Sequence, residues 1–208
     1  MPQGFSEIVD GLRERVESLH RARESALASG RSIIQLSSKA IKHIHRREME
    51  KAHQLLCDLN QLVSAAAEAA EPFPGIKHAP YFQDAVKEYV EAVTLDAIIE
   101  RKPLPNPETM RVEPQAYLNG ICEAASECRR YALDAMRLGE TERARELVDE
   151  MEDVYDELIT FDFPDALMSN LRRNVDALRA VLERTQSDLA VTGTQQELIE
   201  ELRKARSR

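Results

Sequence analysis

The sequence predicts an all-α protein, an antiparallel bundle of six or seven helices. Alanine, glutamate, leucine and arginine are abundant, and the 208 residues include seven glycines and no tryptophan, a composition that favours helices. Apolar residues recur at steps of three and four, and no segment shows the sustained two-residue alternation of a strand. Prolines and glycines gather between the periodic segments. The length suits one domain, residues 1–208.

The first helical block extends from about Phe5 to Ala70 and ends at PFPG, residues 72–75, because proline and glycine together do not continue a helix. Its apolar stripe includes Ile8, Leu12, Val16, Leu19, Ile33, Leu36, Ala40 and Ile44. We expect a bend or a break at Gly30 or within HIHRRE, residues 43–48.

Two central blocks follow. The second, Tyr81–Arg101, begins after Pro80 and stops before KPLPNPE, a connector with three prolines. The third runs from Pro114, which is tolerated in a first helical turn, to Leu138, and Gly139 supplies its stop.

The remaining blocks form the C-terminal part. The fourth, Thr141–Thr160, is heavily acidic and is expected to be an outer, solvated helix. The fifth opens at Pro164 and reaches about Ala190. VTGT, residues 191–194, is then expected to separate it from a short helix, Gln195–Ala205.

Charge and composition restrict the class of protein. The net charge of −9 repels nucleic acid overall, so polyanion binding needs a local basic patch or an enclosed basic channel. The N-terminal stretch MPQGFSEIVDG does not resemble a signal peptide, and no segment approaches the ~20 apolar residues of a membrane helix. We therefore expect a cytoplasmic protein with no membrane partner. Cys57, Cys122 and Cys128 show no CxxC spacing and are expected to be buried free thiols.

Carboxylates form two stripes on the central blocks at 100° per residue. Asp84, Glu88, Glu91 and Leu95 share one stripe, and Glu123, Glu127, Arg130 and Asp134 share the other. Gly120, one turn before Glu123, removes bulk beside the second stripe. Facing helices could hold a divalent cation this way, and an oxygen-only set without an ExxH pair suits magnesium or manganese rather than a di-iron centre. The spacing alone also fits two solvated faces.

Three segments resemble the translin superfamily. KEYVEAV, Lys87–Val93, is similar to QEYVEAV of translin-associated factor X, the nuclease subunit of the translin complex. Tyr117–Glu140 resembles the family's YLxG element, which is followed by an acidic residue, a small residue, a glutamate and a helix ending in a glycine turn. LRRNVDALRAVLERTQSDLAVTG resembles the last long helix. The chain is therefore identified as a translin-superfamily member, closer to the catalytic factor X branch, over roughly Tyr81–Gly193.

This resemblance implies a translin-like subunit of a closed, barrel-like octamer that cuts single-stranded RNA with magnesium. The family's paired catalytic glutamates fall on Glu88 and Glu91, its catalytic aspartate on Glu123, and a further glutamate on Glu127. These four are the expected catalytic and metal-binding residues. Glutamate at 123 is one methylene longer than aspartate, which would shift the reach of this ligand.

Basic residues supply the candidate nucleic-acid contacts. Lys39–His53 places several cations on one helical face, which suits either phosphates or ion pairs with the acidic run Glu140–Glu157. Arg21 and Arg23 lie near the family's first-helix basic residues, and Lys77 and His78 stand where relatives carry a basic cluster. The expected contacts are Arg21, Arg23, Lys42, Arg46, Arg47, Lys77 and His78. His45 is expected to be a packed, hydrogen-bonded core histidine.

The leading hypothesis is a magnesium-dependent endoribonuclease, with manganese as a second candidate metal, built from a homo-oligomeric subunit. The alternatives are a non-catalytic, oligomeric protein of the translin type that binds single-stranded RNA or DNA, and a purely structural helical oligomer. Apolar residues beyond the needs of one bundle would mediate assembly, with the core of the monomer itself as their other role. They are Ile98, Ile99, Leu158, Ile159, Phe161 and Phe163.

Overall fold

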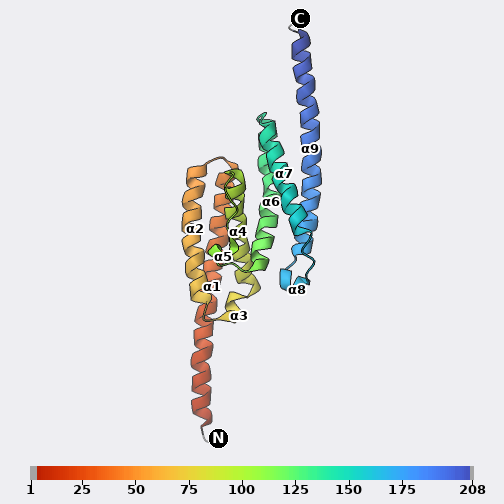
Figure 1. Ribbon diagram of the computed structural model, residues 1–208. Coiled ribbons are helices and arrows are strands. Elements are labelled where there is room, and N and C mark those ends of the chain that lie inside the picture. Colours follow the sequence, from red (N-terminus) through yellow and green to blue (C-terminus); the bar gives the residue numbers. More distant parts are fainter. Residues whose placement is uncertain (1–3, 207–208) are drawn as a thin grey trace.

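The computed structural model describes residues 4–206 and consists of six long helices and three short ones of four residues each (Figure 1). The helices are α1 (Phe5–His45), α2 (Met49–Ala70), α3 (Pro74–Lys77), α4 (Pro80–Ile99), α5 (Pro107–Met110), α6 (Pro114–Arg137), α7 (Thr141–Leu158), α8 (Asp165–Met168) and α9 (Leu171–Arg206). The described residues contain no strand, which confirms the all-α class. None of their helices is long and apolar enough to cross a membrane.

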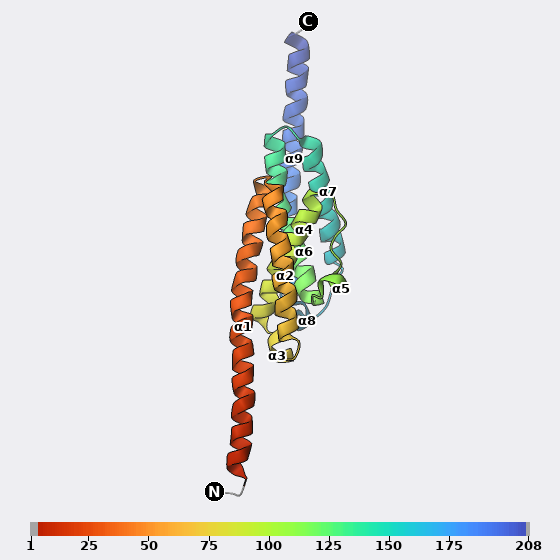
Figure 2. The same ribbon diagram turned by 90° about the vertical axis from the view of Figure 1, so that its left-hand side faces the viewer.

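Helices α4 and α6 form the centre of the bundle. The hairpin of α1 and α2 packs on one side of α4, while α7 and α9 pack on the far side of α6 (Figures 1 and 2). The connector of residues 100–113 leads the chain back past α5, so that α4 and α6 run in the same direction (Figure 1). Their N-terminal ends therefore lie at the same end of the bundle.

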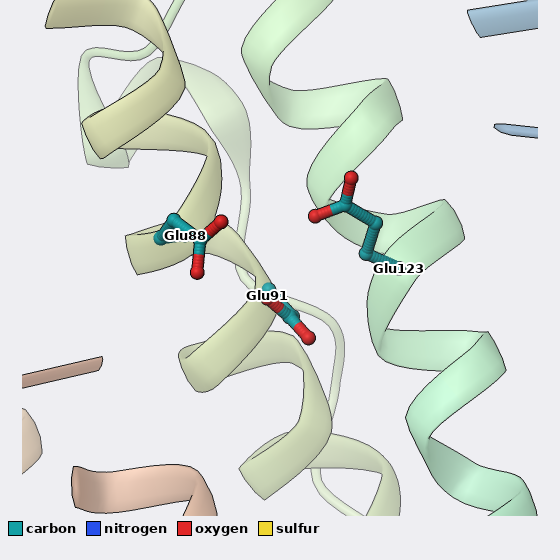
Figure 3. Close-up of side chains that lie close together, drawn as sticks. All are labelled: Glu88, Glu91 and Glu123. Atoms are coloured by element: carbon teal, nitrogen blue, oxygen red, sulfur yellow. The ribbon is translucent and has the colours of Figure 1, made fainter. Parts of the chain in front are cut away.

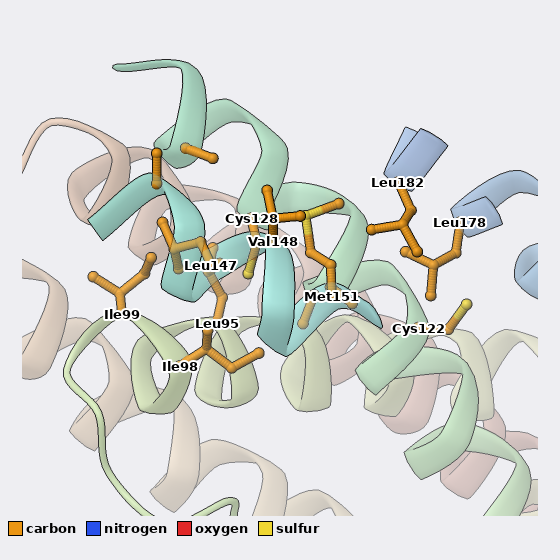
Figure 4. Close-up of a cluster of buried hydrophobic side chains, with 14 of the residues drawn as sticks. Leu95, Ile98, Ile99, Cys122, Cys128, Leu147, Val148, Met151, Leu178 and Leu182 are labelled. Atoms are coloured by element: carbon orange, nitrogen blue, oxygen red, sulfur yellow. The ribbon is translucent and has the colours of Figure 1, made fainter. Parts of the chain in front are cut away.

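The apolar core has two clusters that share these central helices. One cluster joins α4 and α6 to α7 and α9 and includes Leu95, Leu147, Met151 and Leu178 (Figure 4). The other joins them to α1 and α2 through residues such as Phe82 and Val90. Because α4 is covered by α1 and α6, Glu91 and Leu95 on its acidic stripe are buried, whereas Asp84 near its N-terminal end is exposed.

The expected break in the first block lies within HIHRRE. Arg47 adopts a left-handed backbone (φ 59°), and the amide of Glu48 donates to the carbonyl of His43 at 3.0 Å, which ends α1. Gly30 lies inside α1 without breaking it. A Cβ at this position would be 3.5 Å from the Cβ of Ala85, an ordinary contact with α4.

The expected end of the fifth block at VTGT is wrong, because α9 continues through it to Arg206. The hydroxyl of Thr192 donates to the carbonyl of Asp188 at 2.8 Å, and that of Thr194 to Ala190 at 3.1 Å. These bonds keep the threonine hydroxyls paired within the helix, and one glycine costs only about 1 kcal/mol. The block is instead interrupted earlier, at Ser169 and Asn170, which are both left-handed.

Two other expectations need correction. Cys57 is exposed on α2, whereas Cys122 and Cys128 are buried free thiols. Ile98, Ile99 and Leu158, which were candidates for an assembly surface, belong to the core. Of that set, Ile159, Phe161 and Phe163 are exposed.

The ends of the two longest helices project from the bundle in opposite directions (Figures 1 and 2). The first buried residue of α1 is Ala26, and the N-terminal half before it bears an exposed apolar stripe. This stripe, the α1 stripe, consists of Phe5, Ile8, Leu12, Val16 and Leu19. The projecting part of α9 exposes Val191, Leu198, Ile199 and Leu202.

The central pair of helices is held in close contact by Gly120 of α6. A Cβ at this position would lie 2.6 Å from the Cβ of Val90 and 2.8 Å from the carbonyl oxygen of Lys87. Real Cβ atoms do not approach so closely, so no larger residue fits without separating the helices. Gly120 therefore sets the distance between α4 and α6 at the level of the acidic stripes.

We predict that Gly120→Ala will lower the free energy of unfolding by about 1–3 kcal/mol, because the added methyl group overpacks the contact. Gly30→Ala is the matched control. It replaces another helical glycine facing α4, but with room for a methyl group, and should stabilise by up to ~1 kcal/mol. Urea unfolding of both variants measures the difference, and equal stabilities would contradict the proposed tight contact.

Candidate metal centre between α4 and α6

The three carboxylates Glu88, Glu91 and Glu123 come together between the central helices. Glu88 and Glu91 lie one turn apart on α4, and Glu123 extends toward them from α6 (Figure 3). One oxygen atom from each lies within 4.8 Å of the others. Glu91 is buried and the other two are partly exposed, so the cluster opens on one side to solvent.

Lys87 supplies a positive charge inside this cluster. Its Nζ donates to both carboxylate oxygens of Glu123, at 2.7 and 2.6 Å, and lies 3.4 Å from Oε1 of Glu88. Burial alone would lower the pKa of Lys87, but its hydrogen bond and charge interaction with Glu123, and the charge of Glu88, raise it overall. The ammonium therefore stands where a bound cation would neutralise the same oxygens.

Glu91 is the buried member of the three, and its pKa is raised. Burial raises its pKa to about 8, and the charges of Glu88, Glu123 and Glu127 add to this effect. Lys87 lowers the pKa but does not cancel these contributions. A carboxyl group in this state gains from an added cation, which would favour its charged form.

Glu127 lies one turn beyond Glu123 and is held by His45. Nε2 of His45 lies 2.7 Å from Oε2 of Glu127, and the imidazole side chain is 1% exposed. Its Nδ1 is buried without a hydrogen-bond partner among the described residues, so the proton belongs on Nε2, which donates to Glu127. This hydrogen bond holds the pKa of Glu127 below its usual range despite burial. Glu127 is thus a charged neighbour of the three-carboxylate cluster, and His45 is a hydrogen-bonded core histidine.

The residues expected to contact nucleic acid are dispersed and mostly paired with carboxylates. Arg21 lies 3.9 Å from Glu17 and Arg23 lies 3.0 Å from Glu24. Lys77 lies 2.9 Å from Glu71, and His78 is 3.9 Å from Glu113. None of these contacts involves the carboxylate cluster.

The basic helix end is divided between two roles. Arg47 binds Glu140 through both guanidinium nitrogens and stacks over the ring of Tyr131, at 5.0 Å. Arg47 therefore forms the ion pair with the acidic segment Glu140–Glu157 that is one of the two roles expected for the basic residues. Lys42 and Arg46 are exposed and make no side-chain hydrogen bond or ion pair in the described part of the chain.

Sequence patterns missed two contributors to the site. Lys87 stands inside the quoted KEYVEAV segment, but its role depends on Glu123, which is 36 residues away in the chain. Asn174 of α9 donates to Oδ1 of Asn119 at 2.8 Å and lies 3.4 Å from Oε1 of Glu123. No periodicity within α9 indicates this contact, because it depends on how α9 packs against α6.

The donor set fits a divalent cation. Three carboxylates offer only oxygen ligands, which magnesium and manganese prefer. Burial and the neighbouring carboxylates raise the pKa of Glu91, and the ammonium of Lys87 lies against Glu123, so a cation is favoured beside these oxygens. The cluster is therefore a candidate metal centre.

Comparisons with known proteins agree with this architecture. A model of the translin family matches residues 10–187. The uncharacterized protein MJ0175 of Methanocaldococcus jannaschii is 30% identical over 176 residues, which are 80% of this chain and 74% of that protein. The structure of AfC3PO in complex with duplex RNA is 33% identical, with a TM-score of 0.84, over 90% of this chain and 97% of its own. The crystal structure of apo-NeC3PO, at 21% identity and a TM-score of 0.81, covers 92% of this chain and 98% of its own and shares the fold.

The pKa of Glu91 predicts how stability depends on pH in the absence of metal. Since folding raises this pKa from 4.5 to about 8, the folded state holds the proton more tightly than the unfolded chain does. The favourable contribution is complete below pH 4.5 and is lost as the pH rises through about 8. Relative to wild type, Glu91→Gln should therefore gain stability with pH, by on the order of 3–5 kcal/mol between pH 5 and 9.

Urea unfolding in EDTA at pH 5, 7 and 9 measures this difference. Glu150→Gln, an exposed change on α7, is the control and should follow the wild-type profile. Parallel profiles for wild type and Glu91→Gln would contradict the raised pKa.

Proposed function

Because this chain belongs to the translin family, we propose that it is a metal-dependent endoribonuclease acting on single-stranded RNA. The observation that carries the proposal is the convergence of Glu88, Glu91 and Glu123 from two adjacent helices. The AfC3PO relative, whose structure contains duplex RNA, supports RNA as the ligand class. The restriction to single strands rests on the resemblance to translin-associated factor X.

In this proposal Glu88, Glu91 and Glu123 hold magnesium or manganese. Such a cation, when bound, polarises a phosphate oxygen and activates a water molecule for attack on phosphorus. Glu127 is a further ligand or a partner that orients the site, and its hydrogen bond with His45 fixes the carboxylate. Lys87 is placed to donate to a phosphate oxygen of the bound strand, because its ammonium already lies among the carboxylates.

A second candidate function is a translin-type protein that binds single-stranded RNA or DNA without cutting it. The position of Lys87 favours this alternative, because the ammonium already neutralises Glu123 and Glu88 without a metal. The glutamate at position 123, where the family's catalytic residue is aspartate, points the same way. Metal-dependent cleavage distinguishes the two functions.

We also propose that the protein is a homo-oligomer, with the octamer as the state that the resemblance implies. The α1 stripe places five large apolar side chains in water on a projecting helix, and most helical stability in proteins comes from packing of such an apolar face. A second copy of the chain is the proposed occupant, because each copy brings the α1 stripe at one end and the apolar positions of α9 at the other. In a closed assembly the acidic surface would face outward, while the carboxylate cluster would face an enclosed cavity that RNA enters.

Within such an assembly, Arg21, Arg23, Lys42, Arg46, Arg47, Lys77 and His78 remain the proposed nucleic-acid contacts. Lys42 and Arg46 are the strongest of them, since both are exposed and unpaired in the described part of the chain. Arg47 would have to exchange Glu140 for a phosphate. An intracellular, cytoplasmic location is part of the same proposal.

The test of catalysis is cleavage of a labelled single-stranded RNA by the purified protein, with magnesium or with EDTA. Cleavage should require magnesium, and Glu88→Gln/Glu91→Gln should reduce its rate by at least 100-fold because two of the three ligands lose their charge. Glu150→Gln/Asp153→Asn is the matched control, since it removes two exposed carboxylates at the same spacing on α7. A matching duplex RNA and a DNA of the same sequence test the substrate class.

Equal rates for wild type and Glu88→Gln/Glu91→Gln would remove the catalytic proposal. Binding of RNA without cleavage by wild type would establish the translin-type alternative instead.

Assembly is tested by light scattering at micromolar concentration and physiological salt. The wild type should be several times larger than the 23.6 kDa chain, and Ile8→Glu/Leu12→Glu should shift it to smaller species by charging the α1 stripe. Gln61→Glu/Ser64→Glu adds the same charge to an exposed face of α2 and should leave the size unchanged. A monomeric wild type would contradict both the assembly and the enclosed site.

A further inference from the structure

A cavity lined by both polar and apolar groups adjoins the carboxylate cluster at the N-terminal ends of the central helices. Its volume is about 280 Å³, near the lower limit of ~300 Å³ for small-molecule sites. The first turns of α4 and α6 form two walls, and the turn between α8 and α9 forms the third. The wall residues that matter here are Gln83, Asp84, Lys87, Gln115, Asn119 and Asn170.

The cavity is continuous with the candidate metal centre through shared residues. Lys87 lines the cavity while its Nζ lies 2.6 Å from Oε2 of Glu123. Asn119, on the opposite wall, accepts from Asn174, which also lies beside Glu123. Asp84 precedes Glu88 by one helical turn, a rise of about 6 Å. A molecule in the cavity therefore lies one helical turn from the carboxylates.

The walls carry several hydrogen-bonding side chains, some paired and some unpaired. Asn119 donates to the carbonyl of Met168 at 2.8 Å, which fixes the turn after α8. Gln83 donates through Nε2 to the carbonyl of Lys77 at 2.7 Å, and its Oε1 has no partner among the described residues. The carboxylate of Asp84 is exposed and makes no hydrogen bond or ion pair within residues 4–206. Two acceptors of the first turns of α4 are thus unpaired.

The residues that line the cavity suit a ribose better than a base or a phosphate. No aromatic side chain occurs among the described residues that line the cavity, so an unstacked base would find no ring to stack on. A phosphate offers only acceptors and would be repelled by Asp84. A ribose offers hydroxyl donors, and carboxylates accept such hydroxyls in nucleotide-binding proteins. Its size also suits a cavity of about 280 Å³.

We propose that this cavity binds the ribose next to the phosphate held at Glu88, Glu91 and Glu123, with Asp84 accepting a hydrogen bond from its 2′-hydroxyl. The inference rests on the proposed function and adds how the site distinguishes RNA from DNA. Lys87, at the junction, contacts the phosphate attached to that sugar. The 2′-hydroxyl is the group that DNA lacks, so Asp84 gives RNA its advantage.

The experiment measures binding of one single-stranded RNA and of the DNA with the same sequence, thymine replacing uracil, by fluorescence anisotropy with calcium in place of magnesium. Calcium is used because it takes the same oxygen ligands, and gel electrophoresis checks that the RNA stays intact. Wild type should bind the RNA more tightly, and Asp84→Ala should reduce the ratio of the two dissociation constants by about tenfold or more, the loss expected for one charged hydrogen bond. Asp84→Asn keeps an acceptor oxygen and should retain part of the preference. Asp149→Ala, which removes an exposed aspartate from α7, controls for the change in net charge.

The outcomes separate this inference from the proposed function. An RNA-to-DNA ratio that is unchanged in Asp84→Ala overturns the ribose subsite, whether or not the protein cuts RNA. A wild type that cuts RNA but binds both strands equally overturns it as well. A wild type that binds RNA preferentially, depends on Asp84 and fails to cut RNA supports the subsite while removing the catalytic proposal. Absence of any nucleic-acid binding overturns both.

Discussion

The contact between Gly120 and Val90 is the constraint on which the rest of the molecule depends. An added Cβ at Gly120 would lie 2.6 Å from the Cβ of Val90, so α4 and α6 approach as closely as their backbones permit. This approach lets Glu88 and Glu91 of α4 meet Glu123 of α6, and both apolar clusters use the same two helices as their common wall. A larger residue at position 120 would loosen the core and separate the carboxylates together.

The buried negative charge at this contact is balanced by groups from other parts of the chain. Lys87 offsets Glu123 and Glu88, while His45, from the end of α1, holds Glu127 in its charged form. Burial, with the charges of Glu88, Glu123 and Glu127 added, raises the pKa of Glu91 to about 8, and Lys87 does not cancel these effects. In a low-dielectric site this arrangement favours binding of a cation over an empty, fully ionised cluster. The negative charge of these carboxylates accounts both for the ammonium of Lys87 among them and for the proposed binding of a metal cation.

The carboxylate cluster lies in the centre of the bundle, while the exposed apolar residues lie on the projecting ends of α1 and α9. The bundle buries its own core without the α1 stripe, so that stripe and the apolar positions at the end of α9 remain exposed and form the surface proposed for a second copy. The cavity beside the carboxylates lies at the N-terminal ends of α4 and α6. The proposed assembly surface, metal centre and sugar subsite therefore lie on separate parts of the same subunit.

The sequence by itself determined the helices and the candidate ligands. Helical period and proline positions identified α4 and α6 closely, because both signals are local to one helix. Spacing placed Glu88, Glu91 and Glu123 on two acidic stripes, and the resemblance to the translin superfamily singled them out as candidate ligands. The prediction of a break at VTGT is wrong, since threonine hydroxyls bonded within α9 outweigh the local tendency to turn. Only the tertiary structure decided that Lys87 occupies the cluster, that His45 orients Glu127 and that Ile98 is core while the α1 stripe is exposed. Those outcomes depend on distances between helices far apart in the chain, which no local pattern records.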